Sequence, residues 1–254
     1  RLKRLPGRGA IETRTLRTVG IVELKIQSCL EQLRIPTNVQ IGLYPSLRAV
    51  DIRLTATGVS RRAARAALGR VEAGLRQALG PAVYGTDGDT LEGAVGELLI
   101  HRHQTLAIAE SCTGGLVAHK ITMVPGASQI FLGGVISYSN EIKKEILHVQ
   151  TETLETHGAV SIEVASEMAK NVRKDFKADF SLATTGIAGP EGGSPQKPVG
   201  MVCIATSGRP DSSISVKSYQ MKGDRTHLKE RFSDRALLDL ILNIELPIST
   251  GPTG

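Results

Sequence analysis

The residues best suited to chemistry lie in the segment AESCTGG at positions 109–115, where a serine stands just ahead of two glycines. The apolar run over residues 105–109 predicts a buried strand before it, and the apolar spacing over residues 116–123 predicts a helix after it. Ser111 is therefore expected at a strand-to-helix turn, close to the free backbone N–H groups that begin a helix. This placement suits an acyl-transfer nucleophile beside donors for an oxyanion. The structural alternative, which position alone favours, is that Ser111 and Thr113 cap the helix.

Two more loops that carry hydroxyls or glycines are expected at the same edge of the sheet. A second strand is expected to end near Tyr138 and Asn140. A third is expected to end at Thr185, ahead of a glycine-rich loop that starts at Gly186. Ligands of such sheets collect at the carboxyl ends of the strands. The convergence of three loops therefore favours a functional role for Ser111 over a plain helix cap.

The second part of the chain reads as strands alternating with helices, followed by two further strands and a terminal helix. The expected strands cover residues 105–109, 130–139, 180–185, 199–206 and 213–221, and the expected helices cover 116–123, 141–149, 162–176 and 223–245. Ser161 is expected to cap one helix, Thr151 to start a short turn, and residues 246–254 to form a tail. This order predicts a layered α/β/α domain with a mixed sheet.

The first part of the chain reads as a small α+β module. The expected strands cover residues 12–19, 39–44, 50–56 and 83–87, and the expected helices cover 22–33, 60–79 and 89–101. The second and third strands alternate apolar and polar residues on either side of Pro45, which predicts an antiparallel hairpin. Asp89 is expected to cap the last helix. The boundary between the two domains is expected between residues 103 and 104.

Composition favours a globular cytoplasmic protein. The chain has 254 residues, 41% of them hydrophobic, with no apolar run long enough to span a bilayer. Its three cysteines, Cys29, Cys112 and Cys203, have neither metal-ligand nor disulfide spacing, which fits a reducing compartment. Residues 1–103 hold 16 Lys and Arg against 9 Asp and Glu, whereas residues 104–254 hold 15 against 16. The opening segment, Arg1 to Gly9, is basic and irregular, as expected for a piece of a longer polypeptide.

Several long motifs occur in one order, and together they resemble the CinA C-terminal domain, the nicotinamide-nucleotide amidase family. They are AESCTGG at 109–115, GGVISYSNEIKKEIL at 133–147, HGAVS at 157–161, TTGIAGPEGGSPQKPVG at 184–200 and GDR at 223–225. Residues 12–100 resemble the KH-like middle region of full-length CinA proteins. The first domain of that family, a molybdopterin-binding-like fold linked to ADP-ribose pyrophosphatase activity, has no counterpart in these residues. Metal-dependent pyrophosphatase chemistry is therefore not expected of this chain.

The resemblance implies hydrolysis of nicotinamide mononucleotide (NMN) to nicotinate mononucleotide and ammonia, without a metal or another cofactor. It implies that Ser111 is the nucleophile and works with Tyr138 and Lys143. It leaves open whether Lys143 or Tyr138 takes the serine proton. The expected substrate-binding residues are Thr113, Gly114, Asn140, Thr185, Gly186 and Arg225. The family also implies a homodimer.

Each of these residues also has a structural interpretation. Taken alone, Lys143 reads as a solvated helix residue, Tyr138 as a half-buried core phenol and Arg225 as a surface residue. Thr185 could merely satisfy a backbone group at a strand end. A thiol mechanism at Cys112 is discounted, because no histidine is nearby in the sequence and the resemblance places the nucleophile at Ser111.

Two other functions remain as alternatives. The basic first part could bind nucleic acid, but aromatic residues make up only 3% of the chain and tryptophan is absent, which disfavours base stacking. Gly93-Ala-Val-Gly96 fits the Gly-x-x-Gly loop of RNA-binding KH domains. It lies inside an apolar helical pattern, however, so we interpret it as helix packing. The second alternative is a competence- or damage-linked scaffold without enzyme activity.

Overall fold

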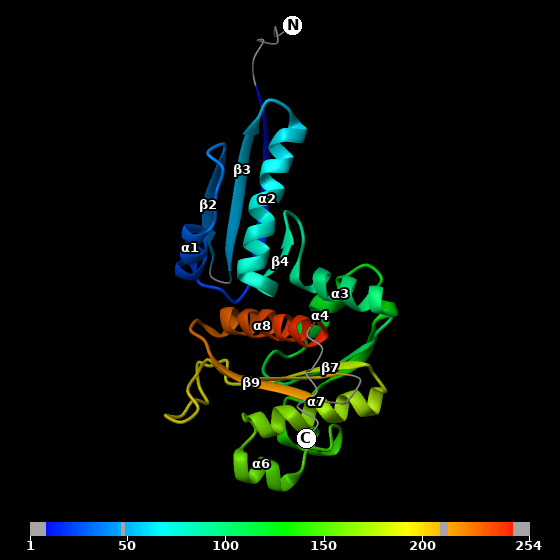
Figure 1. The fold of residues 1–254 in the computed structure, drawn as a ribbon. Helices are drawn as coiled ribbons and strands as arrows, with labels where there is room; N and C mark the ends of the chain where they lie inside the picture. The colour runs from blue at the N-terminus through cyan, green and yellow to red at the C-terminus, as the bar shows by residue number, and fades with distance from the viewer. Residues whose placement is uncertain (1–8, 47–48, 209–212, 246–254) are drawn as a thin grey trace, which may run out of the picture. The chain divides into compact units, whose positions relative to one another are not determined.

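The computed structural model describes residues 9–46, 49–208 and 213–245. The chain divides into two compact units between Thr90 and Leu91 (Figure 1). This division lies earlier than the expected boundary at 103/104, because helix α3 (Leu91–Arg102) packs against helices α4 and α8 of the second unit. The tail expected over 246–254 and the opening segment up to residue 8 lie outside the described residues.

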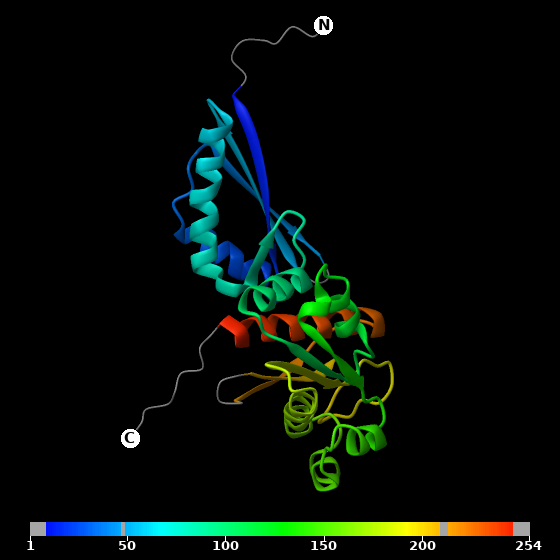
Figure 2. The same ribbon diagram turned by 90° about the vertical axis from the view of Figure 1, so that its right-hand side faces the viewer.

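The first unit is a four-stranded antiparallel sheet with helices packed on one face. Its strands are β1 (Ala10–Thr18), β2 (Val39–Pro45), β3 (Val50–Gly58) and β4 (Val83–Thr86), in the order β2-β3-β1-β4. Its helices are α1 (Glu23–Gln32) and α2 (Arg61–Leu79), and a short 3-10 turn (Gly80–Ala82) precedes β4. Figure 2 shows α2 lying along the sheet. The predicted α+β module, with its β2–β3 hairpin, is confirmed.

Alternation along β3 explains how this unit buries its core. Val50, Ile52 and Leu54 are buried and point toward the helices, while the residues between them are more exposed. Helix α2 meets them with a stripe of buried residues that includes Leu68 and Leu75. The stripe repeats at helical spacing, so one face of α2 is apolar and the other is solvated.

The second unit is built on a mixed five-stranded sheet. Its strands are β5 (Leu106–Glu110), β6 (Phe131–Ile136), β7 (Phe180–Gly186), β8 (Met201–Ser207) and β9 (Ile214–Gln220), in the order β6-β5-β7-β8-β9. Strand β5 pairs in parallel with both β6 and β7, whereas β8 and β9 add in antiparallel fashion. The carboxyl ends of the three parallel strands therefore meet at one edge, as the sequence predicts.

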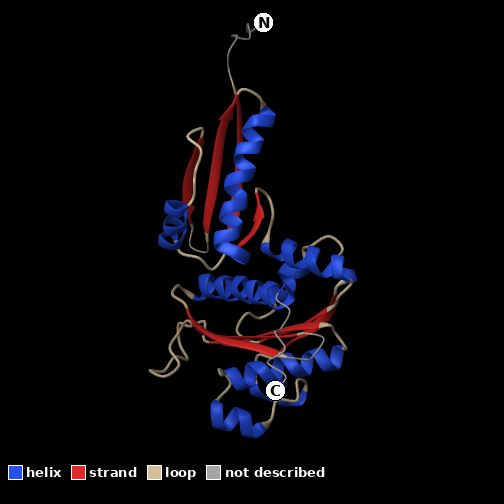
Figure 3. Cartoon of the chain, viewed as in Figure 1, coloured by secondary structure: helices blue, strands red, loops and turns tan. Residues whose placement is uncertain are grey.

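Helices cover both faces of this sheet, which gives the expected α/β/α layers (Figure 3). One face packs against α7 (Ile162–Phe176), and the other packs against α4 (Leu116–Thr122) and α8 (Arg225–Glu245). The remaining elements are a 3-10 turn (Ala127–Gln129), α5 (Asn140–Glu145) and α6 (Thr151–His157). No helix in the described ranges combines the length and apolar character needed to cross a bilayer.

Three local details differ from or sharpen the sequence expectations. Thr151 begins helix α6 rather than a short turn. Asp89 does not begin the helix: its carboxylate accepts the amide of Thr86 at 2.7 Å, and α3 starts two residues later. Gly93 and Gly96 both lie within helix α3, as predicted, and a Cβ added at Gly96 would come 2.7 Å from Val124, so Gly96 allows close packing of the helix.

Candidate active site

The turn after β5 presents Ser111 at the carboxyl edge of the sheet. Its amide donates to the carbonyl of Thr184 at 3.0 Å, so the backbone of Ser111 is still hydrogen-bonded to β7 just after β5 ends. Gly114 and Gly115 follow with φ angles of 61° and 91°, a left-handed conformation that favours glycine. The two glycines thus let the chain reverse sharply into α4 while leaving the serine at the edge.

The buried carboxylate of Glu110 anchors this turn. Only 1% of Glu110 is exposed, and its oxygens accept the amides of Gly115 at 2.9 Å, Val117 at 3.2 Å and Ala118 at 2.8 Å. A carboxylate at a helix start satisfies unpaired N–H groups and complements the helix dipole. The expectation that these amides are free to face a ligand was therefore wrong, because a side chain of the same turn already occupies them.

Lys143 reaches the serine from the first helix after β6. Its Nζ donates to the Oγ of Ser111 at 3.1 Å and to the carbonyl of Ser137 at 2.7 Å. The side chain is 1% exposed, and this burial lowers the pKa of Lys143 below the ordinary value, because water no longer stabilises the ammonium form. Ser139 caps the short helix α5 by accepting the amide of Ile142, which fixes where Lys143 projects. The reading of Lys143 as a solvated helix residue is therefore wrong.

Tyr138 and Arg225 form a second pair on the other side of the site. Nη2 of Arg225 donates to the Tyr138 hydroxyl at 2.9 Å, and Nη1 donates to the carbonyl of Gly189 at 2.7 Å. Tyr138 is 62% exposed, so it is not the half-buried core phenol that the structural interpretation offered. Within the described residues, no hydrogen bond joins the phenol to Ser111 or Lys143.

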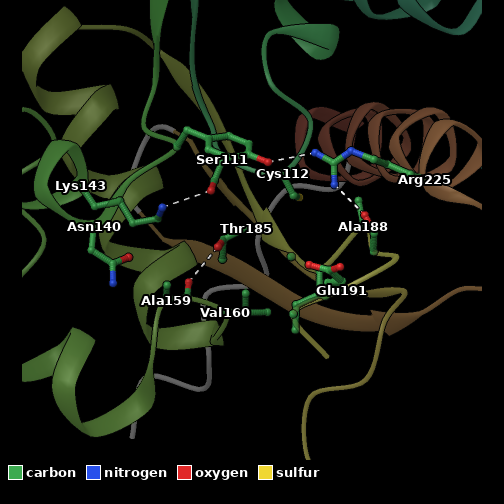
Figure 4. Close-up of a pocket in the computed structure, with 15 residues that line it drawn as sticks. Ser111, Cys112, Asn140, Lys143, Ala159, Val160, Thr185, Ala188, Glu191 and Arg225 are labelled. Carbon is green, nitrogen blue, oxygen red and sulfur yellow. Dashed lines mark hydrogen bonds between the residues drawn. The ribbon is translucent and has the colours of Figure 1, made fainter. Parts of the chain in front are cut away.

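These side chains surround a cavity of about 260 Å³ (Figure 4). Its lining comprises Ser111, Cys112, Tyr138, Asn140, Lys143, Ala159, Val160, Thr185, Gly186, Ile187, Ala188, Gly189, Glu191, Gly192 and Arg225. Thr185 is 1% exposed and donates its hydroxyl to the carbonyl of Ala159 at 2.7 Å, which ties the end of β7 to the segment before α7. Thr185 thus satisfies a backbone group and lines the cavity as well.

Two of the expected substrate-binding residues do not line this cavity. Thr113 is fully buried, and its hydroxyl lies 2.7 Å from that of Thr184, so it braces the turn against β7. Gly114 is exposed and supplies the left-handed bend described above. The seven others expected from the sequence, Ser111, Tyr138, Asn140, Lys143, Thr185, Gly186 and Arg225, lie together around the cavity.

Several lining residues were not among the expected site residues. Ala159 and Val160 belong to the motif HGAVS, whose presence among the matched segments was the available signal. Glu191 lies in the glycine-rich loop. Cys112 is 5% exposed, and burial raises the pKa of its thiol to about 12, so the thiol stays protonated at neutral pH. Within residues 9–46, 49–208 and 213–245, no three His, Cys, Asp or Glu side chains gather as a metal site would require.

The fold and site together define an α/β protein with a buried serine–lysine pair at the carboxyl edge of a mixed sheet, preceded by a small α+β unit. The chain belongs to the CinA family: the CinA C-terminal domain matches residues 88–244, and the damage-inducible protein CinA KH domain matches residues 13–85.

Relatives and solved structures agree with this membership. A CinA-like protein of Chlorobaculum tepidum is 40% identical over 90% of this chain and 55% of its own length. Another, from Parasynechococcus marenigrum, is 46% identical over 85% of this chain and 51% of its own length. The chain spans about half the length of the curated relatives it matches. The crystal structure of competence/damage inducible protein CihA from Agrobacterium tumefaciens, 34% identical, covers 62% of this chain and 98% of its own, with a TM-score of 0.58.

Proposed function

We propose that this chain is a serine-dependent amidohydrolase that converts NMN to nicotinate mononucleotide and ammonia. The observation that carries the proposal is the contact between Ser111 Oγ and Lys143 Nζ, 3.1 Å apart inside the cavity. A hydroxyl becomes a useful nucleophile only when a neighbouring base accepts its proton. The choice of substrate rests on the motifs that the chain shares with nicotinamide-nucleotide amidases.

Lys143 is the better candidate for the base. Burial lowers its pKa, so the neutral amine is more accessible than in a free lysine. The Ser137 carbonyl holds the amine in place from the other side. The phenol of Tyr138, in contrast, is hydrogen-bonded to Arg225. In this scheme Lys143 accepts the serine proton as Ser111 Oγ attacks the carboxamide carbon. Lys143 then gives that proton to the amide nitrogen, which leaves as ammonia when the C–N bond breaks and the acyl-enzyme forms.

The oxyanion of the tetrahedral intermediate needs donors near Ser111. The amides of Gly115, Val117 and Ala118 are held by Glu110, which leaves the amides of Cys112 and Thr113 as the donors closest in sequence to the nucleophile. Water then attacks the carbonyl carbon of the Ser111 acyl-enzyme while neutral Lys143 takes a proton from it. Lys143 returns this proton to Ser111 Oγ as the ester bond breaks, which releases the carboxylic acid and restores the serine.

Ammonia release from NMN by the 254-residue chain tests the proposal. We expect the wild-type chain to release ammonia and to yield a product with the mass of the acid. We expect Ser111→Ala and Lys143→Ala to lose the activity. Lys144→Ala, which changes the adjacent lysine outside the cavity, is the matched control and should keep it. Absence of ammonia with wild-type protein, or wild-type rates with Ser111→Ala, would refute the proposed chemistry.

A further inference from the structure

The cavity beside Ser111 carries two side chains of opposite charge that do not neutralise each other. Glu191 contributes a carboxylate from the loop after β7, and Arg225 contributes a guanidinium from the start of α8. Figure 4 shows both on the side of the cavity away from Lys143. Arg225 donates to the Gly189 carbonyl and the Tyr138 hydroxyl, and no ion pair in the described part of the chain involves Arg225 or Glu191. Both charges are therefore available to a ligand.

Glu191 is also the one carboxylate among the lining residues in the part of the chain that the structure describes. The other lining groups that can ionise contribute little negative charge. Burial raises the pKa of the Cys112 thiol to about 12, so this thiol stays protonated at neutral pH. Apart from the buried Ser111–Lys143 pair, the lining therefore offers a ligand one carboxylate and one guanidinium, those of Glu191 and Arg225.

The loop that carries Glu191 is held at its stem. The amide of Ile187 donates to the carbonyl of Met201 at 2.8 Å, which closes the loop where β7 passes into β8. Arg225 fixes the carbonyl of Gly189, two residues before Glu191, at 2.7 Å. The carboxylate therefore projects from a segment that is tied both to the sheet and to α8, which places it reproducibly at the cavity.

This pattern matches a zwitterionic ligand, and here the inference rests on the proposed function. The pyridine ring of an oxidised nicotinamide nucleotide carries a fixed positive charge on its nitrogen, and the phosphate at the other end carries a negative charge. We infer that Glu191 is a specificity-determining residue that recognises the cationic ring, while Arg225 faces the phosphate. With the carboxamide at Ser111, the ring enters the cavity first, and the ribose separates it from the phosphate.

The physical basis is electrostatic attraction between the ring nitrogen and Glu191, an exposed residue of the cavity lining. Water partly screens such a carboxylate, but the effective dielectric constant near a protein surface is still lower than in bulk water, so the attraction is stronger than in free solution. The charge of the ring is fixed and does not depend on protonation of the ring nitrogen. A reduced dihydropyridine ring has the same outline but no charge, and Glu191 gains nothing from it.

Binding to a variant that cannot turn over tests this inference. In the Ser111→Ala background, titration calorimetry would measure the affinity for NMN and for its reduced form, with and without Glu191→Gln. We expect Glu191→Gln to weaken NMN binding about tenfold, and to leave binding of the reduced form within about twofold. Glu191→Asp, which keeps the charge, should recover part of the loss. Glu152→Gln, an exposed carboxylate of α6 outside the cavity lining, is the matched control.

The outcomes separate the two proposals. Equal weakening of both ligand forms by Glu191→Gln would overturn the inference, because the carboxylate would then be recognising something other than ring charge. Unchanged NMN affinity would overturn it as well. Hydrolysis of NMN by the wild-type chain is a separate assay and is measured first. If the wild-type chain did not hydrolyse NMN, the proposed function itself would be overturned. Thermal melting of each variant shows whether the fold is intact.

Discussion

The amine of Lys143 lies 3.1 Å from the hydroxyl of Ser111, and the two side chains are only 1% and 8% exposed. A buried ammonium loses its hydration, so the pKa of Lys143 falls below the 10.5 of a free lysine. The neutral amine has a lone pair that can accept the serine proton, whereas the ammonium has none. The protonation state of one side chain therefore determines whether the pair can react.

The first prediction concerns pH. We expect kcat/KM for NMN to fall about tenfold per pH unit below the lowered pKa of Lys143, and to level off above it. The midpoint of this fall in kcat/KM should lie below pH 10.5, because 10.5 is the pKa of an unperturbed lysine. Lys143→Arg should be inactive throughout, because a guanidinium does not lose its proton, while Lys144→Arg should behave as wild type. A profile that is flat throughout the folded pH range would contradict Lys143 as the base.

The same shift predicts how stability depends on pH. Between the lowered folded pKa of Lys143 and its unfolded value near 10.5, the unfolded chain binds more protons than the folded chain. This residue therefore costs stability at low pH, and the cost disappears as pH rises toward 10.5. Urea unfolding measures the free energy of unfolding of wild type and of Lys143→Met. As pH rises from the lowered pKa of Lys143 toward 10.5, the free energy of unfolding of wild type should increase relative to that of Lys143→Met.

The second prediction separates Tyr138 from Lys143. The Tyr138 hydroxyl is hydrogen-bonded to Arg225 rather than to Ser111. We therefore expect Tyr138→Phe to lower kcat by about tenfold, while kcat/KM still falls at low pH as Lys143 becomes protonated. The exposed Tyr44→Phe is the control and should change nothing. If the fall of kcat/KM at low pH disappeared in Tyr138→Phe, the phenol rather than Lys143 would be the base.

The third prediction concerns Glu110. Its carboxylate accepts three amides at the start of α4, so Glu110→Ala leaves buried donors without a partner. We expect a loss of about 2–4 kcal/mol in the free energy of unfolding, together with reduced kcat, because the turn carrying Ser111 loosens. Glu152→Gln, on the exposed surface of α6, should stay within about 0.5 kcal/mol of wild type. A similar small effect at Glu110 would show that the carboxylate does not brace the turn.

The fourth prediction concerns the contact between β5 and β6. A Cβ added at Gly134 would lie 2.5 Å from the carbonyl oxygen of Ile108, which is backbone and cannot move cheaply. Gly134→Ala should therefore lower the melting temperature and reduce activity, because it pushes away the strand that leads to Lys143. Gly69→Ala in α2 meets nothing within 4 Å and should stabilise the chain by about 0.5–1 kcal/mol. Equal melting temperatures for the two variants would contradict this account.

The sequence predicted the parts of the fold that depend on local pattern. Apolar runs located the strands of the mixed sheet, and the three loops expected to converge on Ser111 do meet at one cavity. Lys143 and Arg225 were placed by motif resemblance alone, since neither residue carries a local signal that distinguishes it from a surface cation. Their roles became visible only as contacts across the fold.

What could not be predicted depends on the direction of side chains in the folded chain. Glu110 reads as a polar residue at a strand end, and only the return of α4 over β5 places its carboxylate beneath the helix amides. Thr113 was expected to face a ligand, but the turn rotates it toward Thr184 instead. The boundary at Thr90/Leu91 likewise depends on α3 packing against distant α8.

Burial of Cys112 has a consequence for chemical labelling. The thiol adjoins Ser111 in the sequence and lines the same cavity, yet it stays protonated because its pKa is raised to about 12. Alkylating reagents attack thiolates, so this cysteine should survive treatment with iodoacetamide at neutral pH. A sulfonyl fluoride directed at hydroxyls should instead modify the neighbouring serine, and the two reagents together distinguish adjacent nucleophiles by protonation state alone.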